Sequence, residues 1–366
     1  NSISKGYTGY TGYTGKTGDT GPTGPIGPIN FYNKTNDETI LNFRTSKKTL
    51  ETQSILYDIP IKINTSNVIV ELDNHSQYQQ TYTFGKSIPT RWVAGGSVGT
   101  NTLAKSTDGI NWTGLGTSIF TSICYSISWN GTLWVAVGTG TNTIATSLDG
   151  SIWTGRGNTI FNIGRSIAWN GNLWVAVGGS IASTINTIAT SPDGINWTGL
   201  GTSMILSIGY GIAWNGSLWI AVGNGSTYKI ARSPDGITWS GSATSSLFTI
   251  GYGIAWNGSL WVAVGWGSNS IATSPDGIIW SGLGTTIFTT QGNGVAWNGS
   301  LWVAVGQSSN TIATSPDGIN WTGRGNNKLI DGYNVAWNGS LWVAVGSNSI
   351  ATSTDGIIWN TVNVHP

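Results

Sequence analysis

Carboxylate and imidazole side chains, which most often perform acid–base and metal chemistry, are scarce beyond residue 90 of this 366-residue chain. From that point the sequence contains eight Asp and no Glu. Seven of the Asp hold the same place in a repeated motif, and Asp331 alone lies outside it. The two histidines, His75 and His365, also lie outside the repeats. A carboxylate pair, a Ser-His-Asp triad and a His/Cys cluster are therefore not expected, and we predict no catalytic residue, metal site or cofactor.

Aromatic and polar side chains recur instead at one position of the repeat, four residues before a Trp. Aromatic rings stack on sugars, and Arg and Asn bond sugar hydroxyls, so we predict a ligand site here, around the mouth of a central channel. The residues at this position are Tyr125, Arg165, Tyr210, Tyr252, Asn293 and Tyr333. Two loops of variable length add Tyr228 and Trp266 to the predicted site. The alternative interpretation is that these tyrosines are packing residues that cap the core.

The repeat that positions these side chains reads Ser-x-Asp-Gly-x-x-Trp. Successive copies start 41, 44, 42, 41, 41 and 38 residues apart, and a period near 40 residues is typical of a propeller blade. The seven copies are Ser106–Trp112, Ser147–Trp153, Ser191–Trp197, Ser233–Trp239, Ser274–Trp280, Ser315–Trp321 and Ser353–Trp359. We therefore predict an all-β head over residues 81–366, a seven-bladed β-propeller of four-stranded antiparallel blades.

Each repeat contains four short strand candidates. The first two flank an Asn-Gly pair, which favours a type I′ turn with positive φ at both central positions. The third meets the fourth across Pro-Asp-Gly, where Asp is expected to bond the local backbone. Trp rings are expected to fill the space between neighbouring sheets. The first copy lacks the Asn-Gly hairpin, so its innermost strand is expected from residues 82–88 or, failing that, from the tail at 361–364.

This motif resembles the Asp-box, or bacterial neuraminidase repeat, of sialidases and many non-enzymatic propellers, over residues from about 82 to 366. The usual motif has one residue between Asp and Gly, whereas here Asp directly precedes Gly, so a plainer turn is expected. A sialidase-type hydrolase also needs an arginine cluster, an acid and a tyrosine activated by a carboxylate. Because the head offers no paired carboxylate, we predict a protein that is not an enzyme.

A different pattern occupies residues 1–29. From Gly6 to Ile29 glycine stands at every third position for eight triplets, as a collagen-like triple helix requires, and we predict a stalk that forms a homotrimer. A flexible Gly/Thr linker is the alternative. Residues 30–80 are predicted to form a β-rich trimeric neck, with strand-favouring stretches at 55–63 and 67–72. The alternative for this segment is a loosely ordered linker.

The charge balance argues against some partners. Only 8% of residues are charged, and from Arg91 onward eight Lys or Arg stand against eight Asp. This neutral surface predicts no nucleic-acid partner. No apolar run approaches the roughly 20 residues of a membrane span, so no membrane partner is predicted. The single cysteine, Cys124, cannot form an intramolecular disulfide and is expected to be a buried small hydrophobe.

Asn-x-Ser/Thr sequons recur at the predicted hairpin tips, where side chains are exposed enough to carry glycans. These candidate glycosylation sites are Asn130, Asn215, Asn257, Asn298 and Asn338.

A collagen-like stalk, a neck and a terminal propeller together resemble the collagen-like surface fibre proteins of giant DNA viruses. The resemblance implies an extracellular location or one on a virion or cell surface. We predict a trimeric fibre or adhesin whose heads bind glycans or host surfaces, with three linked sites raising the affinity. One alternative is a filament or surface-coat subunit whose propellers pack against neighbouring stalks. Another is a degenerate glycosidase that uses Asp331.

Overall fold

The computed structural model describes the backbone of five short strands before residue 83 and most of the chain from residue 92 to residue 362. Within the latter range it leaves out residues 98, 180–185, 203–206, 243–246 and 348. The chain forms two compact units, Asn1–Pro89 and Thr90–Pro366. Each unit is described by itself below.

The first unit contains two small antiparallel sheets. One consists of β1 (Ile29–Phe31), β2 (Leu41–Arg44) and β3 (Leu56–Tyr57), and the other pairs β4 (Val68–Val70) with β5 (Gln80–Tyr82). Both strand-favouring stretches of the predicted neck therefore contain a strand, β3 and β4. The glycine triplets before Ile29 lie outside the described residues, so the triple helix stays a prediction.

The second unit consists of antiparallel sheets whose strands follow chain order. The first has three strands, β6 (Trp92–Gly95), β7 (Leu103–Ser106) and β8 (Trp112–Gly114). Three four-stranded sheets follow, made of β9 (Ile123–Trp129), β10 (Trp134–Thr139), β11 (Ile144–Ser147) and β12 (Thr154–Gly155); β13 (Gly164–Trp169), β14 (Trp174–Gly178), β15 (Ile188–Ser191) and β16 (Thr198–Gly199); and β17 (Ile208–Trp214), β18 (Trp219–Asn224), β19 (Ile230–Ser233) and β20 (Ser240–Gly241).

The remaining strands repeat the same four-strand pattern. They are β21 (Ile250–Trp256), β22 (Trp261–Trp266), β23 (Ile271–Ser274) and β24 (Ser281–Gly282); β25 (Gln291–Trp297), β26 (Trp302–Gln307), β27 (Ile312–Ser315) and β28 (Thr322–Gly323); and β29 (Gly332–Trp337), β30 (Trp342–Gly346), β31 (Ser349–Ser353) and β32 (Asn360–Val362). A single bridge between Trp266 and Gln291 links the first two of these groups into one eight-stranded sheet.

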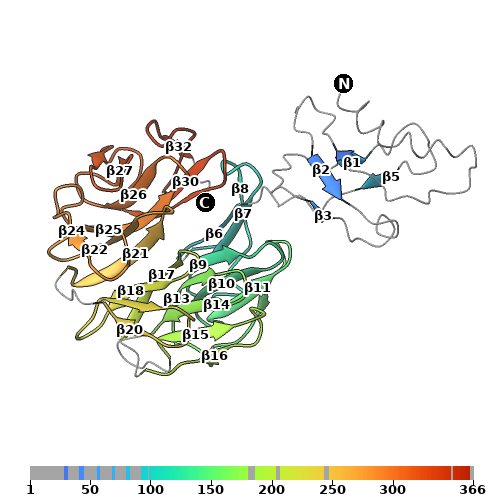
Figure 1. Ribbon diagram of the computed structural model, residues 1–366, viewed down its shortest axis with the longest axis horizontal. Coiled ribbons are helices and arrows are strands. Elements are labelled where there is room, and N and C mark those ends of the chain that lie inside the picture. The colour runs from blue at the N-terminus through green and yellow to red at the C-terminus, as the bar shows by residue number, and fades with distance from the viewer. Residues whose placement is uncertain are drawn as a thin grey trace, which may run out of the picture. The chain divides into compact units, whose positions relative to one another are not determined.

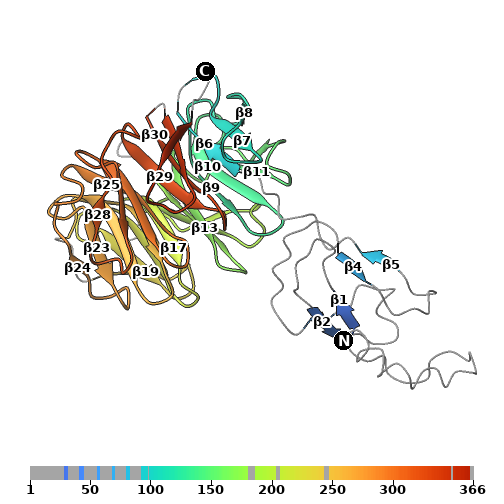
Figure 2. The same ribbon diagram turned by 90° about the horizontal axis from the view of Figure 1, so that it is seen from above.

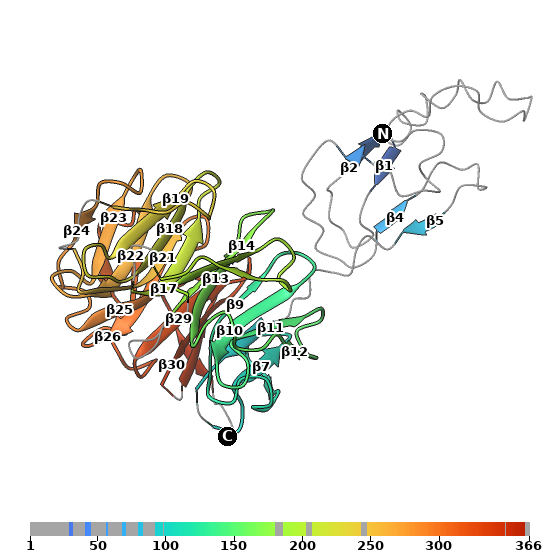
Figure 3. The same cartoon turned by 90° about the horizontal axis from the view of Figure 1, so that it is seen from below.

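The sheets of the second unit are arranged in chain order as the blades of a β-propeller. Their first strands lie side by side in chain order, as β9, β13 and β17 do in Figure 3. We call β9, β13, β17, β21, β25 and β29 the innermost strands. Figures 1 and 2 both show the red strand β30 close to the teal strands of the first sheets, so the last part of the chain returns to the first.

Packing between sheets follows the alternation of the second strand. In β14, Trp174 and Ala176 face the preceding sheet, where they contact Val135. Val175, between them in sequence, faces the following sheet and packs with Trp219. Because side chains alternate along a strand, the sequence Trp-Val-Ala-Val supplies large rings to one interface and small branched groups to the next. The motif tryptophans take part in the same interfaces, so the predicted packing of Trp between sheets is confirmed.

The same contact joins the last sheet to the first. A methyl group added to Gly109, in the first motif, would lie 2.9 Å from Cδ2 of Leu341 and 3.2 Å from Cγ2 of Val343. Within the repeats, the equivalent Gly194 lies 2.9 Å by the same measure from Cδ2 of Leu133 in the sheet before it. The contact between the first motif and the last hairpin is thus one more copy of the contact that joins consecutive sheets.

The Asn-Gly hairpins are not type I′ turns. Trp129 pairs with Trp134 across the four residues between them, and only Gly131 has positive φ, at 100°. The prediction of positive φ at Asn was wrong, because the Asn130 side chain bonds the turn itself. Its Oδ1 accepts the backbone N–H of Thr132 at 2.9 Å and of Leu133 at 2.7 Å. In the turn formed by residues 130–133, Gly131 is the first of the two central residues. Positive φ at that residue alone is the pattern of a type II′ turn.

Neither predicted source supplies an innermost strand to the first sheet within the described residues. Tyr82 lies in β5 and pairs with Val68, and residues 83–88 lie outside the description. The tail strand β32 pairs with β31 as the ordinary fourth strand of its own sheet, because it follows the seventh motif as β28 follows the sixth. The expectation that the tail pairs with the first sheet is therefore wrong for residues 361–362, and residues 363–364 are not described.

Cys124 is buried in β9, as expected of a small hydrophobe, and burial raises the pKa of its thiol. No helix long and apolar enough to cross a bilayer occurs in the part of the chain that the structure describes.

Candidate functional site

The motif aspartates hold turns together. In the first copy, Asp108 Oδ1 accepts the backbone N–H groups of Ile110 at 2.8 Å and Asn111 at 2.7 Å. Ser106 Oγ donates to the same oxygen at 2.9 Å and accepts the N–H of Gly109 at 2.8 Å. Trp112 Nε1 donates to the Gly109 carbonyl at 3.0 Å. The turn is therefore more densely bonded than the plain hairpin expected from the missing residue between Asp and Gly.

These bonds also set the charge of the motif carboxyls. Hydrogen bonds from the backbone N–H groups of Thr238 and Ile237 lower the pKa of Asp235 from 3.8 to about 2, because they favour the ionised form. Backbone N–H groups three and two residues further on have the same effect in other copies. The pKa is lowered in the same way for Asp108, Asp193, Asp276, Asp317 and Asp355. The motif aspartates are thus ionised and occupied by local donors.

The six predicted binding residues at the repeat position share an unexpected backbone feature, a β-bulge in the innermost strand. In β17, Gly209 pairs with Gly223 and Gly211 pairs with Val222, so Tyr210 is an extra residue with no partner across the ladder. The register shifts in the same way in the other five innermost strands, at Tyr125, Arg165, Tyr252, Asn293 and Tyr333. A bulge redirects one side chain out of the alternation of its strand. It therefore gives these six side chains a common direction.

Four of the six side chains form one cluster across consecutive innermost strands. The Arg165 guanidinium carbon lies 4.7 Å from the ring centre of Tyr125 and 4.7 Å from that of Tyr210. The rings of Tyr210 and Tyr252 meet edge to face, with centres 5.3 Å apart and planes at 84°. All four side chains are half-buried. We call Tyr125, Arg165, Tyr210 and Tyr252 the Tyr–Arg cluster.

The cluster lies at one end of the sheets. Tyr210 is near the start of β17, and the Asn-Gly hairpin follows its last residue, Trp214. In an antiparallel sheet the hairpin after the first strand and the motif turn after the third share the other end. The cluster therefore shares its end with the loops between second and third strands, the loops that vary in length.

Asn293 and Tyr333 continue the series with polar contacts. Asn293 Nδ2 donates to the Gly332 carbonyl at 2.8 Å, and its Oδ1 accepts from Gln291 Nε2 at 2.8 Å. Tyr333 is 49% exposed, and its hydroxyl lies 2.7 Å from Ser347 Oγ. Asn293 is thus held by neighbouring groups, whereas Tyr333 presents its ring to solvent. Gln291 was not predicted as part of the site, although it stands two residues before Asn293.

The two predicted loop residues have different places. The Tyr228 ring lies against Gly241, where Asn186 lies against Gly199 in the preceding sheet. Tyr228 therefore replaces a packing asparagine and stands outside the Tyr–Arg cluster. Trp266, at the end of β22, is 45% exposed and pairs with Gln291 of β25. Its ring lies at the same end of the sheets as the cluster.

The predicted glycosylation sites are all turn residues with their oxygen engaged. In each hairpin the Asn Oδ1 accepts two backbone N–H groups, as Asn215 accepts those of Ser217 and Leu218. Their Nδ2 has no hydrogen-bond partner among the described residues. Sequon asparagines within the motifs differ, because Asn320 Nδ2 donates to Asp317 Oδ2 at 2.8 Å. The structure places the hairpin asparagines but does not test whether they carry glycans.

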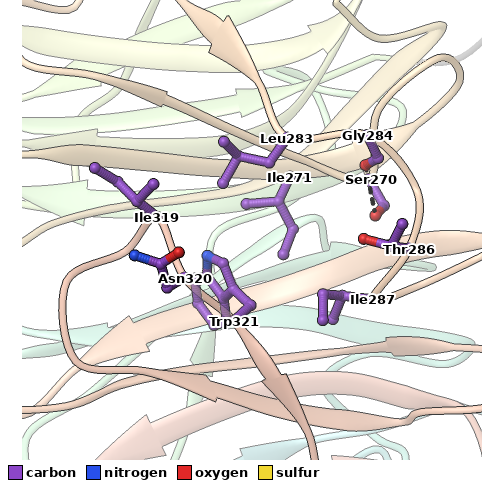
Figure 4. A pocket seen from close by; sticks show the side chains of 9 residues that line it. All are labelled: Ser270, Ile271, Leu283, Gly284, Thr286, Ile287, Ile319, Asn320 and Trp321. Atoms are coloured by element: carbon purple, nitrogen blue, oxygen red, sulfur yellow. Dashed lines mark hydrogen bonds between the residues drawn. The ribbon is translucent and has the colours of Figure 1, made fainter.

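A small cavity lies apart from the cluster, between two consecutive sheets. Its volume is about 180 Å³, below the roughly 300 Å³ at which small-molecule sites begin. Figure 4 shows Ile319, Asn320 and Trp321 of one motif turn facing the residues that precede and follow β24. No residue of the Tyr–Arg cluster lines this cavity. Its walls combine the polar side chains of Ser270, Thr286 and Asn320 with apolar ones, and none of the lining residues is an acid or a base.

Catalytic and metal chemistry has few candidates in the described part of the chain. No three His, Cys, Asp or Glu side chains there could jointly hold a metal ion. Asp331 has φ of 47°, and its Oδ2 lies 3.5 Å from Ser347 Oγ.

Comparison with known proteins defines the fold. No protein family and no curated protein matches the chain. Among solved structures, it is similar to a catalytically inactive virginiamycin B lyase from Staphylococcus aureus with quinupristin, at TM-score 0.55, 13% identity and coverage of 65% of this chain and 83% of the other. A streptogramin B lyase structure gives TM-score 0.54, 12% identity and coverage of 66% and 83%. These similarities support a β-propeller and, at such low identity, concern the fold alone.

Proposed function

We propose that the chain is a non-enzymatic trimeric surface fibre or adhesin whose propeller heads bind glycans or host surfaces through the Tyr–Arg cluster. The observation that carries the proposal is the contact between four bulge side chains on four consecutive innermost strands. Bulges that turn three tyrosines and an arginine toward one another at the variable-loop end build a polar and aromatic surface on a rigid scaffold.

The chemistry of this surface suits a sugar ligand. Tyrosine rings pack against the apolar faces of a sugar ring, and their hydroxyls bond its hydroxyl groups. Trp266 and Tyr333, both about half exposed at the same end, extend this surface beyond the cluster. The head is nearly neutral in charge, which favours an uncharged or weakly charged partner over nucleic acid.

We further propose that the head has seven blades and an Asp-box ancestry. Seven motif copies and the contact of Gly109 with Leu341, which repeats the contact between consecutive sheets, support a closed ring of seven. The trimer is supported by the eight glycine triplets alone. Display on a virion or cell surface follows from that architecture, as does avidity from three heads.

The absence of catalysis in this proposal rests on the state of the carboxylates. The motif aspartates accept hydrogen bonds from local backbone N–H groups, and hydrolysis of a glycoside needs two carboxylates flanking the bond. Asp331 is the remaining candidate for a degenerate glycosidase. Turnover of a fluorogenic glycoside that disappears in Asp331→Asn would favour that alternative over binding alone.

A glycan array probed with the intact trimer tests the proposal. We expect binding to a subset of glycans that is lost in the double variant Tyr210→Ala with Tyr252→Ala and retained in Tyr228→Phe, the control whose ring lies against Gly241 of β20. Sedimentation should give three chains per particle. No binding above background by a correctly folded head would contradict the adhesin.

A second candidate function, a coat or filament subunit, is favoured by the exposed isoleucines of the motif turns. They recur at the two positions after the motif glycine, and Ile152 is 78% exposed. The others are Ile110, Ile195, Ile237, Ile278, Ile279, Ile319, Ile357 and Ile358. Electron microscopy separates the candidates, because an ordered lattice of heads against stalks favours the coat and free terminal heads favour the adhesin.

A further inference from the structure

We propose that Arg165 is the anchor for an acidic group, a carboxylate or sulfate, on the saccharide that the head binds. This inference rests on the proposed glycan-binding function and names the class of ligand. It starts from the contacts of Arg165 itself, the only cation in the Tyr–Arg cluster.

Two tyrosine rings pack against the Arg165 guanidinium, and no protein group bonds its N–H groups among the described residues. Tyr125 and Tyr210 lie on it at 4.7 Å each. The remaining direction for an interaction is the plane of the guanidinium, where its N–H groups point. In the part of the chain that the structure describes, Nε is buried and has no hydrogen-bond partner. Nε is thus out of a ligand's reach, whereas the terminal Nη groups are not among the buried atoms and can donate to a ligand.

No protein carboxylate within the cluster balances the charge of Arg165. Seven of the eight aspartates beyond residue 90 belong to the motif turns, at the opposite end of the sheets. Asp331, the eighth, lies near Ser347 in the last sheet. The tyrosine faces stabilise the cation without neutralising it. Arg165 therefore holds a net positive charge in a half-buried place.

The neighbouring tyrosines leave this charge intact. Burial and the adjacent Tyr210 raise the pKa of Tyr252, while Arg165 lowers it to a smaller extent. The Tyr252 hydroxyl is thus neutral near pH 7 and can donate to an anion. An arginine packed against two rings is restricted in its motion, and its planar guanidinium suits the two oxygens of a carboxylate or sulfate.

The test uses the intact chain and three polymer-linked probes at equal density: β-glucuronide, glucose 6-sulfate and β-glucoside. The first two separate carboxylate from sulfate, and the third is neutral. We expect at least one acidic probe to bind about tenfold or more tightly than the glucoside, as charge-assisted bonds imply. This preference should weaken as salt is added. Arg165→Gln should abolish the preference, and Arg165→Lys should retain only part of it.

Arg156→Gln is the matched control, because the Arg156 guanidinium bonds Thr146 Oγ1 and lies outside the cluster. If Arg165→Gln does not fold, two other measurements test the assignment. They are the partial loss of the acidic preference in Arg165→Lys and the weakening of that preference by salt in the unaltered chain. Equal binding of all three probes, or a preference that survives Arg165→Gln, overturns the assignment and leaves glycan binding standing. Binding of none of the probes, together with an empty glycan array, overturns both.

Discussion

Gly109 and Leu341 are in contact although 232 positions separate them in the sequence, and this contact joins the first motif to the last hairpin. A Cβ at Gly109 would lie 2.9 Å from Cδ2 of Leu341 and 2.9 Å from Nε1 of Trp92. Five further motif glycines make the same contact with a Leu of the sheet before them, and Gly150 contacts Val93 of the first sheet. The last sheet thus packs against the first through the same kind of interface that joins consecutive sheets elsewhere in the chain.

Gly109→Ala should therefore destabilise the head more than Gly116→Ala. Both glycines have φ near 77°, so the backbone strain of an alanine is about the same, roughly 1–2 kcal/mol. Only Gly109 has neighbours within 4 Å of the added carbon, and overpacking adds about 1–3 kcal/mol. Chemical denaturation of the two variants measures the difference. Equal losses of stability would contradict the contact, and Leu341→Ala combined with Gly109→Ala should recover part of the loss.

Acid should destabilise the head through the motif aspartates. In six of the seven copies the folded pKa lies below the unfolded value of 3.8, and that of Asp235 is about 2. Depressed carboxyl pKa values stabilise the fold above the unfolded pKa, and this contribution is lost as pH falls through the folded pKa. Melting temperatures should therefore be steady from pH 7 to about 5 and fall between about pH 4 and 2. A flat profile over that interval, or an unchanged slope in Asp235→Asn, would be inconsistent with these turns.

Cys124 should resist thiol reagents in the folded protein. Burial raises its pKa and excludes the reagent, and the thiolate is the reactive form. Labelling with a maleimide should be slow in buffer and fast in denaturant, with one thiol per chain. Rapid labelling of the native protein would show that Cys124 in β9 is accessible to the reagent, contrary to the structure.

Sequons in the hairpins should carry glycans more often than sequons in the motifs if the protein is made in a glycosylating cell. Asn215 leaves Nδ2 without a partner among the described residues, whereas Asn320 uses Nδ2 to bond Asp317. Glycopeptide mass spectrometry should find glycans at the hairpin asparagines in preference to Asn320 and its equivalents. Equal occupancy would mean that folded-state bonding has no influence on modification.

The sequence predicted the repeating sheets well because each physical requirement recurs in every copy. The motif Asp and the hairpin Asn mark both turns, and alternation in Trp-Val-Ala-Val marks the buried second strand. The turn type was missed because a side-chain oxygen, such as Asn130 Oδ1, takes over backbone bonding that periodicity does not reveal.

Spacing identified the repeat position at which we propose binding, but it did not identify the bulge there. Gly209 and Gly211 flank Tyr210, and glycines inside a strand pattern are a signal for a bulge that could have been used. The cation–π contacts of Arg165 could not be predicted, because they join residues more than 35 positions apart across separate sheets. The position of Tyr228 outside the cluster could not be predicted either, because its ring contacts Gly241 only in the folded sheet.

The most direct test of the account is the affinity of the intact trimer for its best array glycan, measured by surface plasmon resonance with and without Tyr210→Ala. Loss of a stacking ring should weaken binding about tenfold, while Tyr228→Phe leaves it unchanged. Equal affinity of the Tyr210→Ala variant and the unaltered chain would contradict binding at the Tyr–Arg cluster.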